Sequence, residues 1–308
     1  MRIVRRLLLW AAREPALRRR LPRFRFMRRA VRRFMPGETM TDALAAAGPL
    51  DVEGIGTIYT HLGENLGSLD EAQVVADHYA ELLDRIAAAG IRGEISVKLS
   101  QLGVDLDVDA CFGHLVRLAR HSADRGSYLW LDMEGSAYTE VTLGLYERLR
   151  AVEPRTGICL QAYLRRTGAD IERLRPLDPA IRLVKGAYDE PETRAYRDRG
   201  GVDANYLGLA VRFLLDGRDR PIRLGLGTHD VALIERIATR VEAAGIPRTT
   251  FEVQMLYGVR SREQRRLAGA GYRVQTLIAY GDAWYQWYMR RLAERPANVM
   301  FAFRSILP

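Results

Sequence analysis

Short apolar segments alternate with longer amphipathic segments along most of the chain after residue 50, and this alternation constrains the fold more than any other feature. The apolar segments are rich in β-branched residues, as strands buried within a parallel sheet are. They cover residues 56–62, 94–99, 128–133, 157–163, 181–187, 222–229, 251–256 and 272–280. Such a repeated unit of strand and helix indicates the α/β class with a parallel sheet.

Amphipathic helices are expected in the intervals, as at residues 71–90 and 230–245. In the second interval, Leu233, Ile237 and Val241 recur at helical spacing. Eight strand–helix units suit a TIM-like (βα)8 barrel, which typically has about 250 residues. An open doubly wound sheet is the alternative, but it usually carries G-x-G-x-x-G after an early strand, and no segment here has that context. The sequence therefore predicts the barrel.

Basic residues are concentrated at the N-terminus. Residues 1–40 hold 13 Arg and only two acidic residues, whereas the rest of the chain is nearly neutral. We therefore expect a basic helical extension over residues 1–40 and a barrel domain over residues 41–308. A neutral body argues against nucleic-acid binding, which needs a basic face on the fold itself.

Two interpretations of the basic extension are open, packing on the barrel and binding to a membrane. Residues 1–33 are a candidate for peripheral contact with an anionic membrane, because each basic residue near such a surface gains about 1 kcal/mol. No apolar run in the sequence reaches the roughly 18–20 residues of a membrane span.

Lysine is rare, because Lys98 and Lys185 are the only two among 47 basic residues. This bias towards Arg is typical of GC-rich bacterial genomes and marks both lysines as candidates for functional positions. Neither Cys111 nor Cys159 belongs to a C-x-x-C pattern, which argues against a disulfide framework and a thiolate metal site. We expect no metal and a location in the bacterial cytoplasm, with peripheral contact at the inner face of the membrane.

Charged and amide side chains stand at nearly every predicted strand end, where the active site of a barrel gathers. They are Glu64, Lys98, Asp132, Gln161, Arg182, Lys185, Thr228, His229 and Gln254. Burying such groups is costly unless they meet each other or a ligand. Ion pairs between loops would explain one or two of them, but a ligand site explains the whole set better.

A C-terminal helix is predicted over residues 284–295, and it carries two adjacent arginines. Arg290 and Arg291 lie about 100° apart on a helix, so both can reach one anion. Guanidinium groups match carboxylates in bidentate geometry. The pattern predicts a helix over the barrel mouth that clamps a carboxylate.

Several longer motifs occur in order along the chain: KLSQLG (98–103), LDMEGS (131–136), LQAYLRRT (160–167), RLVKGAYDEP (182–191), GTHD (227–230), FEVQMLYGVR (251–260) and RRLAERPANVMF (290–301). Through these motifs, from about residue 35 to the end, the chain resembles the FAD-dependent proline dehydrogenase family. The resemblance implies oxidation of L-proline to Δ1-pyrroline-5-carboxylate, with hydride transfer to flavin N5. It also implies a membrane quinone as electron acceptor and a pyrroline-5-carboxylate dehydrogenase as a partner.

The resemblance also implies residue roles. Asp132 and Arg182 are the implied catalytic residues, and Glu64 with Arg290 is the implied gate. The implied substrate-binding residues are Lys98, Leu256, Leu277, Trp287, Arg290 and Arg291. The implied FAD-binding residues are Met133, Gln161, Arg182, Val184, Lys185, Gly186, Ala187, Thr228, His229, Gln254 and Glu294.

Two positions depart from the family pattern. Leu277 and Trp287 stand where proline-oxidising members usually have Tyr. Both positions line the side of the substrate ring, so another cyclic or N-alkyl amino acid is an alternative substrate. Hydroxyproline fits less well, because Leu cannot bond its hydroxyl group.

Two other functions stay open at this point. A Schiff-base lyase could use Lys98 or Lys185 at a strand end, although this leaves Arg182 and the paired arginines without a role. A non-catalytic barrel held at the membrane by its basic extension is the other alternative.

Overall fold

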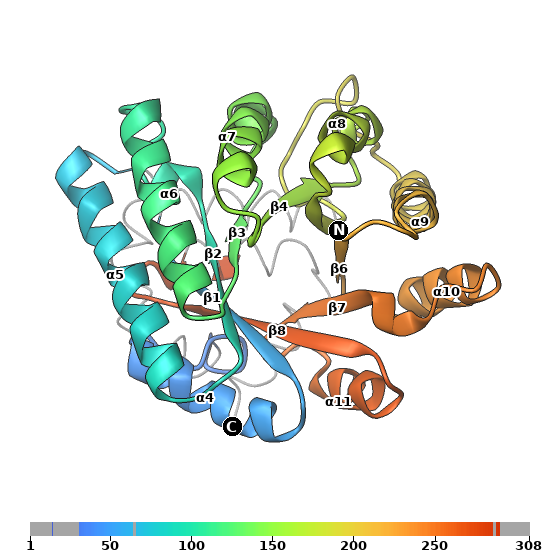
Figure 1. Ribbon diagram of the computed structural model, residues 1–308, viewed down its shortest axis with the longest axis horizontal. Coiled ribbons are helices and arrows are strands. Elements are labelled where there is room, and N and C mark those ends of the chain that lie inside the picture. Colours follow the sequence, from blue (N-terminus) through green and yellow to red (C-terminus); the bar gives the residue numbers. More distant parts are fainter. Residues whose placement is uncertain (1–13, 15–30, 64–65, 286–287, 290–308) are drawn as a thin grey trace.

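Eight parallel strands close into a barrel in the computed structural model, in the order β1 to β8 around the ring (Figure 1). The structure describes residue 14 and residues 31–63, 66–285 and 288–289. The strands are β1 (Gly56–His61), β2 (Gly93–Val97), β3 (Leu129–Leu131), β4 (Thr156–Gln161), β5 (Ala180–Val184), β6 (Arg223–Gly227), β7 (Phe251–Leu256) and β8 (Arg273–Tyr280). The (βα)8 prediction is confirmed, and each predicted strand segment overlaps one observed strand.

The ring is closed by pairing between β1 and β8. Six residue pairs join these strands, from Gly56 with Gln275 to His61 with Tyr280. Because the first and last strands pair, the sheet has no free edge at which another chain could add.

Helices surround the ring on its outer side (Figure 1). They are α4 (Met40–Val52), α5 (Leu69–Ala88), α6 (Val108–Asp124), α7 (Thr139–Val152), α8 (Thr167–Leu174), α9 (Arg199–Asp216), α10 (Val231–Glu242) and α11 (Ser261–Gly269). Short 3-10 helices lie at Leu99–Gln101, Ser136–Tyr138, Arg175–Leu177 and Arg248–Thr250. Helix α4 precedes the barrel and packs against β1 and β8.

Helix α10 illustrates why these segments form helices. It begins after Asp230, whose carboxylate accepts a hydrogen bond from the backbone N–H of Leu233. The apolar stripe of Leu233, Ile237 and Val241 is buried as predicted. The chain leaves the helix with Gly245 at a positive φ of 78°, which glycine adopts without strain.

The core has two parts of different character. Between the ring and the helices, the packing is apolar. Inside the ring, polar side chains from opposite strands meet, since Glu94 of β2 contacts Arg223 of β6 and Ser96 of β2 contacts Arg182 of β5. Barrel interiors are usually filled by branched aliphatic residues, so this interior is unusually polar.

Most of the predicted basic extension, residues 1–13 and 15–30, and most of the predicted C-terminal helix lie outside the described residues. A helical turn begins at Trp284, and the side chains of Trp284, Tyr285, Tyr288 and Met289 are buried. Within the described ranges, no helix has the length and hydropathy to cross a membrane.

Candidate active site

A triad of polar side chains, Ser96, Asp132 and Arg182, occupies the C-terminal mouth of the barrel. Asp132 follows β3, and its Oδ1 lies 2.9 Å from Nη1 of Arg182 on β5. The hydroxyl of Ser96 on β2 donates to the same carboxylate oxygen at 2.7 Å and accepts from Arg182 Nη1 at 2.8 Å. Three strands thus fix one carboxylate and one guanidinium against each other.

Arg182 has one guanidinium nitrogen that the described residues leave for a ligand. Its Nε donates to Gln254 Oε1 at 2.5 Å, and its guanidinium lies 4.7 Å from the centre of the Trp130 ring. Its Nη2 is buried and has no hydrogen-bond acceptor among the described residues. A buried donor without a partner costs about 1–3 kcal/mol, so this atom indicates a place for an acceptor from a bound molecule.

Gln161, at the end of β4, presents an acceptor in the same region. Its amide nitrogen donates to the backbone carbonyls of Met133 and Glu134, at 3.3 and 3.2 Å. Its Oε1 is buried and has no donor among the residues that the structure describes. Glu134 is itself held by the backbone N–H and the hydroxyl of Ser100. The amide is therefore fixed with its oxygen available to a ligand.

Lys185 follows β5 and is held by two carboxylates. Its Nζ lies 2.5 Å from Asp203 of α9 and 2.9 Å from Asp230, which caps α10. The burial of Asp230 opposes ionisation, but the Lys185 contact outweighs it and lowers the pKa of this carboxyl. The ammonium group is thereby fixed beside the turn that carries Thr228 and His229.

Position 186 requires glycine because of its backbone conformation and its close contact with Tyr163. Its φ is +111°, and a Cβ at this position would lie 2.1 Å from Cδ1 of Tyr163. Any larger residue would therefore displace the Tyr163 ring and strain the backbone after β5.

The β7–β8 side of the mouth is apolar. Leu256 and Leu277 are register partners on these strands, and both are half-buried. Leu277 also packs against the buried cluster of Ile58, Trp130 and Ala180. A ligand on this side meets hydrocarbon rather than hydroxyl groups.

The remaining predicted site residues fall into two groups. Lys98, Val184, Ala187, Thr228 and His229 lie at or just beyond the C-terminal ends of β2, β5 and β6, as predicted. Glu64, Trp287, Arg290, Arg291 and Glu294 lie outside the described residues, so the predicted gate and carboxylate clamp remain predictions.

Sequence reasoning missed Ser96, which touches both implied catalytic residues. Because side chains alternate along a strand, residues 94, 96 and 98 of the β2 segment face the same side. This alternation could have identified Ser96 from the sequence, because Lys98 was already predicted to belong to the site.

Thiol chemistry is disfavoured at this mouth. Cys159 of β4 is the register partner of Arg182, but burial raises the pKa of its thiol to about 12. A nucleophilic cysteine reacts as the thiolate. Among the described His, Cys, Asp and Glu side chains, no three gather as metal ligands.

Comparisons with known proteins identify several relatives of this chain. The family model described as proline dehydrogenase matches residues 43–304. Proline dehydrogenase 1 of Bacillus subtilis subsp. natto is 35% identical over 91% of this chain and 91% of its own length. Proline dehydrogenase of Deinococcus radiodurans is 36% identical over 89% of each chain.

A solved structure shows the same fold. The crystal structure of proline utilization A (PutA) from Bdellovibrio bacteriovorus, inactivated by N-propargylglycine, superposes with a TM-score of 0.81 at 26% identity. The match covers 88% of this chain but only 33% of that longer one. On the family match and the curated relatives together, this chain belongs to the proline dehydrogenase family.

Proposed function

We propose that this protein oxidises L-proline to Δ1-pyrroline-5-carboxylate with FAD as its cofactor. The observation that carries the proposal is a pair of buried polar atoms at the mouth, Arg182 Nη2 and Gln161 Oε1, which have no hydrogen-bond partner within the described ranges, in a chain of this family. One is a donor and the other an acceptor, and a flavin ring presents both acceptors and an N–H donor. The described residues thus fit the cofactor.

The substrate loses a hydride from the carbon beside nitrogen and a proton from nitrogen, and a C=N bond forms. The flavin supplies the two-electron oxidation when it is bound. Oδ1 of Asp132 accepts hydrogen bonds from Ser96 and Arg182. We therefore expect Oδ2 of Asp132, together with Lys98, to face the substrate nitrogen. A fixed cation at Arg182 stabilises the negative charge that develops during hydride transfer.

The other predicted residues complete the site. Met133, Val184, Lys185, Gly186, Ala187, Thr228, His229, Gln254 and Glu294 are proposed to hold FAD along the strand ends. Arg290 and Arg291 are proposed to bind the substrate carboxylate, with Glu64 and Arg290 as the gate. Holding the C–H bond about 3–3.5 Å from its acceptor is the main task of these contacts.

A second candidate substrate is another cyclic or N-alkyl amino acid, because Leu277 and Leu256 make the ring side apolar. A Schiff-base lyase is less well supported, because the family match gives no role to an imine-forming lysine. The absorbance spectrum of the purified protein tests these functions first. An oxidised-flavin band that proline bleaches anaerobically supports the proposal.

Substrate identity is tested by dye-linked turnover of proline, hydroxyproline, pipecolate and N-methyl amino acids. Turnover of another substrate without turnover of proline would overturn proline as the substrate. A protein that stays colourless with added FAD would favour a non-catalytic barrel.

Electrons are proposed to pass to a membrane quinone, with the protein in the bacterial cytoplasm and residues 1–33 in peripheral contact with an anionic membrane. A pyrroline-5-carboxylate dehydrogenase is the proposed partner that consumes the product. Deletion of residues 1–33 should weaken binding to liposomes that contain anionic lipid and preserve dye-linked turnover. Unchanged liposome binding would contradict the membrane role.

A further inference from the structure

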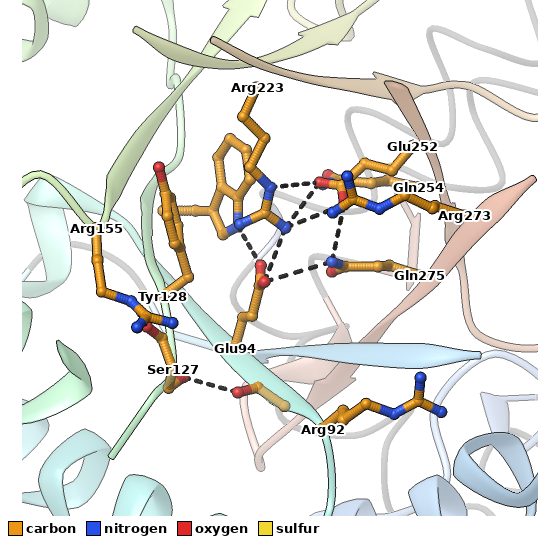
Figure 2. A network of polar contacts seen from close by, with 12 residues as sticks. Arg92, Glu94, Ser127, Tyr128, Arg155, Arg223, Glu252, Gln254, Arg273 and Gln275 are labelled. Carbon is orange, nitrogen blue, oxygen red and sulfur yellow. Dashed lines mark hydrogen bonds and ion pairs between the residues drawn. The ribbon is translucent and has the colours of Figure 1, made fainter. Parts of the chain in front are cut away.

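A partly buried polar cluster lies inside the barrel below the mouth, formed by Glu94, Arg223, Glu252 and Gln275 (Figure 2). Nη2 of Arg223 lies 2.7 Å from Glu94 and 2.8 Å from Glu252. Gln275 donates to Glu252 at 3.1 Å. These three charges come from β2, β6 and β7, and Arg273 of β8 adds a fourth at 3.5 Å from Glu252, so the cluster ties opposite sides of the ring together.

Such a cluster is costly to bury, and apolar residues of similar size would fill the space with less desolvation. Only 1% of the Glu252 side chain is exposed. Burial raises the pKa of Glu252, yet every described contact of its carboxylate is with a donor, which only the ionised form satisfies. A role beyond packing would account for this cost.

The cluster is connected to the mouth through Gln254. The amide nitrogen of Gln254 donates to Glu252 Oε1 at 2.8 Å, and its amide oxygen accepts from Arg182 Nε at 2.5 Å. The chemistry of the two partners permits one amide orientation only, because a carboxylate can only accept and a guanidinium can only donate. Glu252 and Arg182 therefore hold the Gln254 amide in this orientation from its two ends.

The barrel wall leaves room for this connection at Gly225. This residue is the register partner of both Arg182 and Glu252. A Cβ at Gly225 would lie 2.6 Å from Nε2 and 2.7 Å from Cδ of Gln254. The missing side chain lets the Gln254 amide lie across β6 towards Arg182.

We propose that Glu252 is a positioning residue, which acts through the Gln254 amide to hold Arg182 in the orientation that hydride transfer requires. The inference rests on the proposed flavin-dependent function. Glu252 touches neither substrate nor cofactor in this account. Its effect reaches the reaction through two consecutive hydrogen bonds.

Glu94 provides a matched control for Glu252. It accepts hydrogen bonds from Arg223 and from the Trp130 indole, at 2.7 and 2.6 Å. It therefore shares the same buried cation, but it makes no described contact with Gln254. Glu252→Gln and Glu94→Gln remove the same charge from the same cluster. Only the first replaces the acceptor of the Gln254 nitrogen, a carboxylate that can only accept, with an amide that can also donate.

The test uses the full-length flavin-loaded enzyme mixed anaerobically with proline. In E252Q, we expect the rate constant of flavin reduction at saturating proline to fall about tenfold, less than the 10²–10³-fold typical of removing a direct donor. The proline concentration at half-saturation should change less than about twofold, because ground-state binding is untouched. E94Q should stay within about twofold of the wild type in both quantities.

The midpoint potential of the bound flavin gives a readout that does not depend on turnover. A cation held near the reduced flavin raises this potential, so loss of its positioning lowers it. We expect the potential of E252Q to lie below that of E94Q. Loss of negative charge alone would raise the potential in both variants, because it favours the anionic reduced flavin.

Gly225→Ala tests the same connection without changing any charge, and it serves if E252Q does not fold. The added methyl group must displace the Gln254 amide, so the rate constant and the potential should both fall. Wild-type values in G225A would overturn the inference, and so would equal effects of E252Q and E94Q. If proline does not reduce the flavin of the wild-type protein, that result would instead overturn the proposed function, and this inference with it.

Discussion

The guanidinium of Arg182 and the carboxylate of Asp132 meet at 2.9 Å across the barrel mouth, although their strands are separated by β4. The two side chains differ in exposure, at 4% for Arg182 and 21% for Asp132. The cation is thus fixed from below by the barrel interior, while the carboxylate borders the open mouth. This arrangement suits a fixed cation that acts on a bound ring and a carboxylate that meets the substrate.

Arg182→Lys tests whether the geometry of this cation matters as well as its charge. Lysine keeps the charge but cannot bond Gln254, Ser96 and Asp132 at once in planar geometry. We expect kcat/KM for proline to fall by about 10²–10³-fold, measured with a dye acceptor. Arg155→Lys, at the opposite end of the barrel, serves as the control and should keep full turnover.

Ser96→Ala tests the hydroxyl that joins Asp132 to Arg182. Ser96 is fully buried, and its loss leaves two charged groups short of a partner. We expect the free energy of unfolding to fall by about 1–3 kcal/mol, with a fall in kcat/KM. Urea unfolding and steady-state kinetics measure the two effects.

Ser122→Ala is the matched control for this variant. Ser122 is equally buried, but its hydroxyl has no hydrogen-bond partner among the described residues. Its removal should change the free energy of unfolding by less than about 0.5 kcal/mol. Equal losses in both serine variants would contradict the role given to Ser96.

Gly186→Ala tests the turn after β5. The positive φ and the contact with Tyr163 should together cost about 1–3 kcal/mol of unfolding free energy. The turn lies beside Lys185, so retention of FAD on gel filtration should weaken as well. Gly144→Ala in α7 has open space around the new methyl group and should stabilise the helix by about 0.5–1 kcal/mol.

His61→Phe tests the pH dependence of stability. Burial, and then the charge of His78, lowers the pKa of His61 to about 4 from the ordinary 6.5. Between these values, the unfolded chain binds more protons than the folded one, so acid in this window destabilises the protein.

Phenylalanine keeps the ring contact with His78, whose centre lies 4.2 Å away, but it does not titrate. The loss of unfolding free energy between pH 7 and pH 5, measured in urea, should be smaller in H61F than in the wild type. Identical pH slopes would show that His61 does not contribute.

The strand–helix alternation predicted the barrel because each strand carries its own apolar signal. The rule that the active site of a barrel gathers at the strand ends grouped Lys98, Asp132 and Arg182. This rule also needs only the position of each residue within its own strand segment. Strand lengths were predicted less well: β3 is only Leu129–Leu131, since Asp132 leaves the strand to enter the site.

The contacts inside the ring could not be predicted in this way. Ser96 reaches Arg182, and Glu94 reaches Arg223, from strands on opposite sides of the barrel. Such pairs depend on the stagger between strands, which no local period encodes. The sequence therefore indicates which residues face inwards, but not which of them meet.

The pairing of β1 with β8 has a consequence for how the protein is made. Strand β1, which contains Gly56, can pair with β8 only after Gln275 has been synthesised, about 220 residues later. Until then, the nascent sheet has two open borders that can recruit other chains. Strand β8, which is synthesised last, therefore closes the barrel. Translation that stalls before β8 would release a chain prone to aggregate.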